Sequence, residues 1–240
     1  MFKRFLIITM ALLSITTIRA QPPMKAVILY HQGVSFMNKE KYPEAMASFF
    51  KALATYKNYD SAYFQMANIN VKFSSFDTAI SFYNKALKIN PKFFLAYMNL
   101  ANIYRNFKED IDKTLTYYLK AREIDSTNKE ALIGAAWCYN VQLKYDLAIT
   151  TAKKALQFDN NYKPAYGELA HAYHLSGRYA EAIEQFKKNI AISPTETPMY
   201  YCGLCYIELK DKAGALSMYD ALVKLSPKMA DALKARIDKM

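Results

Sequence analysis

The chain has 240 residues, of which 52% are hydrophobic and 22% charged, and its formal net charge is +11. It is therefore long and apolar enough to bury a large core. Its six glycines are scattered singly, which excludes a glycine-rich loop that cradles phosphate groups. With three cysteines, at least one thiol has no partner for a disulfide within the chain.

Residues 1–20 have the pattern of a secretory signal peptide. Lys3 and Arg4 precede an uncharged apolar run from Phe5 to Ile18, and Ala20 is a small residue suited to cleavage. The run is shorter than the about 20 residues that span a membrane. We therefore expect export to the periplasm or the medium with removal of this segment, which leaves a mature chain without a transmembrane span; an uncleaved anchor is the alternative. Removal takes away three cations and no acid, so the net charge falls from +11 to +8.

A pattern of two short amphipathic helices follows, and it is clearest in Ser61–Pro91. Apolar residues recur in each half at spacings of three and four, as on one face of a helix. Small residues at Ala67 and Ala79 would let the two helix backbones approach closely. Pro91 cannot continue the second helix, so the chain turns and the pattern starts again.

The same pattern fits the chain six times in register, with one inserted residue near Asp110 and one deleted residue near Thr195. The segments are approximately 26–59, 60–93, 94–128, 129–162, 163–195 and 196–227. The first small position holds Gly33, Ala67, Ala101, Ala136, Ala170 and Gly203, and the second holds Ala45, Ala79, Thr114, Ala148, Ala182 and Ala215.

This spacing resembles the tetratricopeptide repeat family, whose unit has about 34 residues. The resemblance implies an all-α fold, a right-handed superhelical solenoid of six helix-turn-helix repeats over residues 26–227. The tail, residues 228–240, carries Met229, Leu233, Ile237 and Met240 along one helical face. We expect this tail to be a capping helix that shields the last repeat from water.

In this family, ligands usually lie along the concave face formed by the first helices. The resemblance therefore implies a non-enzymatic scaffold that binds a protein or a peptide in this groove. Carried over position by position, the groove residues are Tyr30, Phe64, Asn68, Asn102, Arg105, Trp137, Asn140, His171, His174 and Tyr200. The alternative is that they are ordinary surface residues.

The residue types suit a peptide ligand. A carboxamide carries both a donor and an acceptor, as a peptide backbone requires, and aromatic anchors dominate many binding energies. Trp137 lies in the fourth of six repeats, so we expect it to form the centre of the ligand site, flanked by Asn102 and Asn140.

Two patterns in the last two repeats leave a redox or metal-linked role open. Cys202 and Cys205 have the spacing of a redox dithiol, but we expect them inside a helix, at positions that are apolar in other repeats, and hence in the core. His171 and His174 have the i, i+3 spacing of two ligands to one metal. Glu168 is the only third ligand on that helix, so we interpret both histidines as groove residues. We expect no catalytic residue, no cofactor and no bound metal.

Lysines recur at one position of the second helices, where they would form a stripe on the outer surface. They are Lys51, Lys85, Lys120, Lys154 and Lys188. We interpret the stripe as a solvated face, with a basic adaptor to an anionic envelope surface as the alternative. Nucleic acid is not an expected partner of an exported chain.

Overall fold

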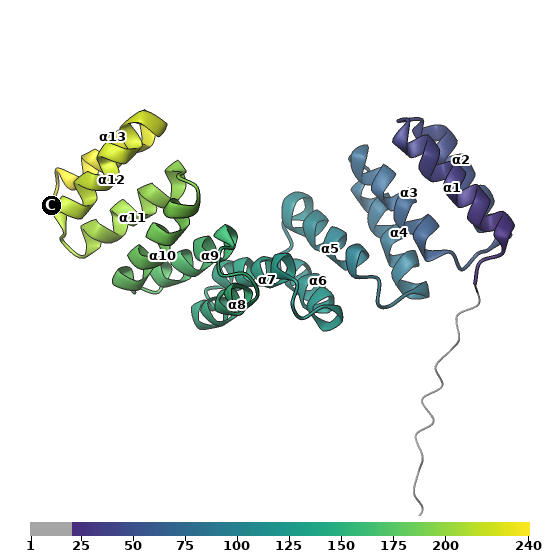
Figure 1. The fold of residues 1–240 in the computed structure, drawn as a ribbon, viewed down its shortest axis with the longest axis horizontal. Coiled ribbons are helices and arrows are strands. Elements are labelled where there is room, and N and C mark those ends of the chain that lie inside the picture. The colour runs from purple at the N-terminus through teal and green to yellow at the C-terminus, as the bar shows by residue number, and fades with distance from the viewer. Residues whose placement is uncertain (1–20) are drawn as a thin grey trace, which may run out of the picture. The chain divides into compact units, whose positions relative to one another are not determined.

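The computed structural model describes residues 21–240, which form thirteen α-helices, one π-helix and no strand (Figure 1). The predicted signal peptide, residues 1–20, lies outside the described residues. The first helices of the pairs are α1 (Met24–Asn38), α3 (Asp60–Lys72), α5 (Phe94–Ile103), α7 (Lys129–Val141), α9 (Lys163–Leu175) and α11 (Glu196–Glu208). The second helices are α2 (Tyr42–Thr55), α4 (Phe76–Ile89), α6 (Ile111–Ile124), α8 (Tyr145–Phe158), α10 (Tyr179–Ile192) and α12 (Lys212–Leu225). The π-helix η1 (Tyr104–Lys108) extends α5, and α13 (Pro227–Ile237) ends the helical part. Within residues 21–240, no helix is long and apolar enough to cross a membrane.

The helices form two compact units, which divide after Ala62. In the first unit, α1 packs on α2, and a Cβ added at Gly33 would lie 2.5 Å from a ring atom of Phe49. This contact explains why the repeat has glycine where most others have alanine, because a side chain there would overlap a fully buried ring. The ring of Tyr30 lies 5.7 Å from that of Phe49 and 5.0 Å from that of Tyr59.

The predicted small positions are buried in every repeat. Ten of them are alanine or threonine with no exposed surface, and the other two are the buried glycines Gly33 and Gly203. The larger rings and aliphatic side chains of neighbouring positions fill the space around them, as in the cluster that contains Tyr83, Leu100 and Ile103. The predicted close approach of the helices is therefore confirmed.

The turn between the first and second helix of a pair has one recurrent geometry. In five turns, the N–H of the residue before the second helix donates to the carbonyl oxygen five residues earlier; these donors are Lys41, Ser75, Lys144, Arg178 and Asp211. The preceding residue has a positive φ in each case, at Glu40, Ser74, Leu143, Gly177 and Lys210. This left-handed residue reverses the chain over a short distance.

The third turn contains one residue more than the other five. Here the N–H of Asp110 donates to the carbonyl oxygen of Tyr104, six residues earlier, at 3.1 Å, and the left-handed residue is Glu109 with φ 52°. The extra residue is absorbed by η1, because the wider π-helical turn takes in one more residue per hydrogen-bonded ring. The insertion predicted near Asp110 is therefore confirmed.

The end of the chain also follows the predicted spacing. The connection from α10 to α11 is residues 193–195, whereas other connections, such as residues 90–93, have four residues. Helix α13 packs on α11 and α12, with Leu233 and Ile237 fully buried. Met240 follows the end of α13 and is 44% exposed, so it does not continue the buried face as the sequence predicted.

Candidate functional site

In the second unit, residues 63–240, three side chains form a closed hydrogen-bond network between α3, α4 and α5. The hydroxyl of Tyr83 donates to Oδ1 of Asn68 at 2.5 Å. Nδ2 of Asn99 donates to the same oxygen at 3.1 Å and to the Tyr83 hydroxyl at 2.8 Å. Burial raises the pKa of Tyr83 to about 12, against the opposing effect of the hydrogen bond from Asn99. The hydroxyl therefore keeps its proton and holds both carboxamides in one orientation.

A second carboxamide lies beside this network. Oδ1 of Asn102 accepts a hydrogen bond from the Tyr118 hydroxyl at 3.0 Å, and burial raises the pKa of Tyr118, so this donor is also protonated. Nδ2 of Asn102 donates to no group within residues 21–240, and Asn102 is exposed. Its orientation is thus fixed by the oxygen, while its two N–H groups remain available to a ligand.

These carboxamides line a concave pocket of about 330 Å³ that lies wholly within the second unit. Its apolar walls come from the end of α3, the end of α5 and η1. The lining residues are Asn68, Val71, Lys72, Tyr83, Asn99, Asn102, Ile103 and Phe107.

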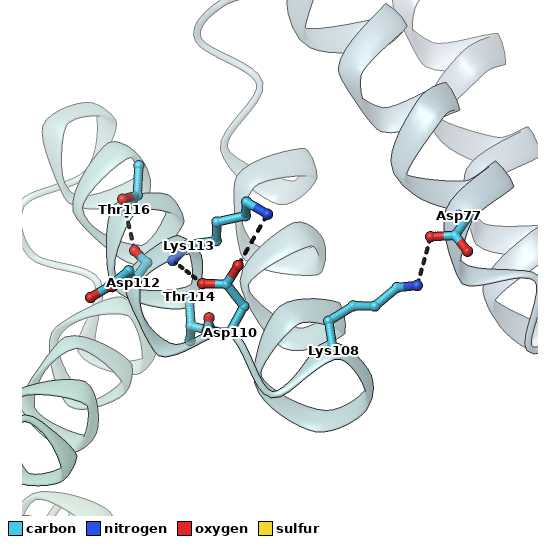
Figure 2. Close-up of polar contacts among 7 residues, drawn as sticks. All are labelled: Asp77, Lys108, Asp110, Asp112, Lys113, Thr114 and Thr116. Carbon is cyan, nitrogen blue, oxygen red and sulfur yellow. Dashed lines mark hydrogen bonds and ion pairs between the residues drawn. The ribbon is translucent and has the colours of Figure 1, made fainter.

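The wall that η1 supplies is anchored on both sides (Figure 2). Phe107 stacks on Phe76 of α4 with ring centroids 3.9 Å apart, and Nζ of Lys108 lies 2.6 Å from a carboxylate oxygen of Asp77. On the other side, Asp110 caps α6 by accepting from the N–H of Lys113 at 2.9 Å and pairs with its Nζ at 3.0 Å. These hydrogen bonds lower the pKa of Asp110, so the cap is ionised at neutral pH and the turn is held at both ends.

The predicted centre of the groove is only partly open. The guanidinium of Arg105, carried by η1, lies 4.3 Å from the ring centroid of Trp137, and Trp137 itself is half-buried. Asn140 is buried, and its Nδ2 donates to the backbone oxygen and to Oε2 of Glu168, each at 3.0 Å. Burial raises the pKa of Glu168, whereas Asn140 and Arg105 oppose this rise. Asn140 thus joins α7 to α9, and the indole face toward Arg105 is already covered.

The two histidines of α9 surround one tyrosine of α11. The ring centroid of Tyr201 lies 4.9 Å from that of His171 and 5.5 Å from that of His174, and Tyr200 meets Tyr201 edge-on at 5.8 Å. Burial lowers the pKa of both histidines, and His174 adds to the lowering at His171. In residues 21–240 there is no group of three His, Cys, Asp or Glu residues that could hold a metal ion.

All three cysteines lie in the core. Cys138, Cys202 and Cys205 are buried and, within residues 21–240, form no disulfide. Burial raises their pKa values to about 12, about 11 and about 12. Nδ1 of His174 lies 3.3 Å from Sγ of Cys205. Neutral, inaccessible thiols are poor nucleophiles, which agrees with the core interpretation and disfavours a redox role.

Two aromatic groove candidates are used for packing. Phe64 is only 8% exposed and stacks on Phe93 at 4.7 Å and against Tyr83 at 5.6 Å. Its ring therefore belongs to the core between α3 and α4 and does not form an exposed anchor, contrary to the role suggested by the sequence. Tyr30 lies in the first unit, half-buried between Phe49 and Tyr59.

Sequence reasoning did not assign four residues to the groove: Asn99, Tyr83, Phe107 and Glu168. Asn99 follows Asn68 by 31 residues, and Glu168 follows Asn140 by 28. Residues at a spacing slightly below one repeat meet where consecutive first helices are in contact. Pairs of polar residues at this spacing are therefore the sequence signal that could have found Asn99 and Glu168.

Comparisons with known proteins agree with the repeat architecture. Family models described as tetratricopeptide repeat match residues 60–93, 82–113, 164–196 and 199–228. These segments of the chain are therefore similar to tetratricopeptide repeats. A comparison with curated protein sequences finds no match.

Several solved structures share the fold. PilW, a type IV pilus biogenesis factor, has a TM-score of 0.68 and 20% identity over 87% of this chain and 97% of its own. YrrB, described as a tetratricopeptide repeat protein with an unusual peptide-binding site, has a TM-score of 0.68 and 23% identity over 78% of this chain and 97% of its own. A tetratricopeptide repeat protein from Parabacteroides merdae has a TM-score of 0.71 and 18% identity over 90% of this chain and 86% of its own. At these identities the likeness concerns the all-α repeat fold alone.

Proposed function

We propose that this protein is a non-catalytic scaffold that binds a protein or peptide partner on the face formed by its first helices. The observation that carries the proposal is Asn102, an exposed carboxamide whose oxygen is held by Tyr118 while its N–H groups have no partner within residues 21–240. An oriented, unsatisfied amide suits the carbonyl groups of a peptide backbone. A peptide-binding site is also the stated feature of YrrB, which has the same fold.

The proposal includes export and a division of the chain. Residues 1–20 serve as a cleaved signal peptide, residues 26–227 form six repeats, residues 228–240 cap the last one, and the mature protein acts in the periplasm or outside the cell. The charge pattern of the first 20 residues supports export. Mass spectrometry of the mature protein should show an N-terminus at Gln21. An intact Met1 in a soluble cytoplasmic fraction would contradict this part.

The binding face can be tested by site-specific photo-crosslinking in the native cell. A photo-reactive residue at Asn102 reports on the first helices, and one at Lys120, which is exposed on the second helix of the same repeat, is the matched control. We expect a defined adduct from position 102 and none from position 120. Equal yields at both positions, or adducts from position 120 alone, would refute the proposed face.

Affinity for the partner identified in this way tests the predicted anchor. Trp137→Ala should weaken binding about thirtyfold, since truncating a central aromatic anchor costs roughly 2 kcal/mol. Phe158→Ala, which removes an exposed ring from the second helix of the same repeat, should leave affinity unchanged. If Trp137→Ala folds and binds as the wild type does, the ligand site is not centred on Trp137.

A further inference from the structure

The pocket between α3 and α5 has a more specific use than the rest of the face. We infer that it binds one large apolar side chain of an extended, uncharged peptide segment, whose backbone crosses the carboxamides at its mouth. This inference rests on the proposed function and names the chemistry of the ligand. It adds a second anchor point, the pocket beside η1, to the one predicted at Trp137.

The apolar part of the lining selects the side chain. Val71, Ile103 and Phe107 form walls from three elements, and Phe107 keeps 53% of its surface exposed although it stacks on Phe76. Covering this surface with an apolar side chain is favourable, whereas burying a charged side chain against it is unfavourable. Lys72 is the one charged residue among the described residues that line the pocket.

The hydrogen-bonding capacity of the carboxamides selects the backbone. Asn68 Oδ1 already accepts two hydrogen bonds, and Asn99 Nδ2 already donates two. Asn68 Nδ2 donates one hydrogen bond to Oε1 of Gln65 at 3.0 Å, which leaves its second N–H. The other remaining groups are the side-chain oxygen Oδ1 of Asn99, which accepts from no group within residues 21–240, and the two N–H groups of Asn102. Asn99 and Asn102 lie three residues apart on α5 and both line the pocket. The acceptor of Asn99 and the donors of Asn102 match the N–H and C=O groups of an extended peptide, and neither needs a ligand charge.

The size and rigidity of the pocket fit a single residue. Its volume of about 330 Å³ is near the lower end of the range of about 300–1,000 Å³ for ligand sites. The wall carried by η1 is held by the Lys108–Asp77 ion pair and by the Asp110 cap before any ligand binds (Figure 2). A preformed wall reduces the loss of conformational entropy that accompanies ligand binding.

The experiment uses blocked tripeptides as probes. Acetyl-Gly-Xaa-Gly-amide, with Leu, Phe, Asp or Lys at Xaa, is titrated into the ¹⁵N-labelled mature chain, residues 21–240. The readouts are the side-chain amide signals of Asn99 and Asn102 and the indole signal of Trp137, each identified by substitution. We expect the Leu and Phe peptides to shift the two amide signals with dissociation constants on the order of millimolar. The Asp and Lys peptides should bind on the order of tenfold more weakly.

Two variants test the wall itself. Phe107→Ala removes it, and we expect the affinity for the Leu peptide to fall on the order of tenfold. Phe73→Ala is the matched control, because Phe73 is an exposed phenylalanine that directly follows α3 and does not line the pocket. Its affinity should equal that of the wild type. Circular dichroism of both variants confirms that the helices are retained.

The possible failures separate this inference from the proposed function. Equal binding of the charged peptides, or a folded Phe107→Ala variant with unchanged affinity, overturns the inference. Peptides that shift the Trp137 indole and leave Asn99 and Asn102 unshifted also overturn it, while the proposed function stands. If no tripeptide shifts any signal but position 102 still crosslinks to a partner, the inference fails alone. If crosslinking also fails at position 102 and at Leu95, an exposed residue of the same helix whose substitution keeps the Asn102 carboxamide, both are wrong.

Discussion

The contact between the third and fourth repeats should require a glycine at position 134, in α7. A Cβ at this position would lie 2.3 Å from Cζ and 2.5 Å from both Cε atoms of Tyr118. Carbon atoms pack at about 3.5–4.0 Å, so the ring or the helix must move by about 1 Å or more. Tyr118 is only 3% exposed and its hydroxyl holds Asn102, which leaves little room for that movement.

The expected cost of Gly134→Ala follows from two opposing effects. Alanine in a helix interior is favoured over glycine by about 1 kcal/mol. Overpacking a core costs about 1–3 kcal/mol, and contact with three ring atoms places this site at the upper end. We therefore expect a net loss of about 1–2 kcal/mol, measured as a lower urea midpoint and a melting temperature lower by about 2–8 °C.

Gly167→Ala is the matched control in α9. There the nearest atom to an added Cβ is Nδ2 of Asn189 at 3.3 Å. The helix propensity of alanine, about 1 kcal/mol, is opposed only by this slightly tight contact, so the stability should be unchanged or higher. As a rescue, Tyr118→Leu removes the overlapping ring, and Gly134→Ala should then cost at least about 1 kcal/mol less than in the wild type. If Gly134→Ala and Gly167→Ala unfold at the same urea concentration, the ring yields freely and the proposed steric requirement is refuted.

Three further predictions concern the turns, the last helix and the thiols. Gly177 has φ +75°, so Gly177→Ala should lower stability by about 1 kcal/mol. Leu143→Gly, at an exposed residue with φ 58°, should not lower stability. The opposite order of the two variants in urea unfolding would show that these turns are unstrained. Leu233 of α13 is fully buried, so Leu233→Ala should cost about 2–5 kcal/mol and speed amide hydrogen exchange in α13. Unchanged exchange would show that this helix is not held by its apolar face. The folded state raises the pKa of the three thiols from 9.0 to about 11 or 12, so their contribution to stability is present below about pH 9 and is lost as the pH rises from 9 toward 12. In a variant with alanine at all three positions, the urea midpoint should fall less over this pH range than in the wild type. An equal fall would show that other groups cause the loss of stability.

The repeat architecture could be predicted from the sequence because its causes are local and recur. Close packing of two short helices requires a small residue at fixed positions, and the requirement repeats in each unit, so six weak signals reinforce one another. The burial of both small positions in each repeat confirms this reasoning. Spacing alone also located the extra residue near Asp110.

The form of that third turn could not be predicted in the same way. An extra residue can lengthen a loop or widen a helical turn, and the outcome depends on side chains from another element. Here Phe76 and Asp77 of α4 contact Phe107 and Lys108, and the residue is taken up as η1. These partners lie about 31 residues apart in the chain, beyond the reach of any local pattern.

For the binding site, too, the sequence indicated some features and the tertiary structure decided the others. Repeat position assigned Asn68, Asn102 and Asn140 to the ligand groove. Asn68 and Asn102 line the pocket, whereas Asn140 is buried and donates to Glu168. An asparagine has the same donors and acceptors at every position, and packing decides which of them a neighbour satisfies. A hydrogen bond forms only with a group that the fold brings within about 3 Å. The contacts between repeats therefore decided that the oxygen of Asn102 is occupied while its N–H groups remain available.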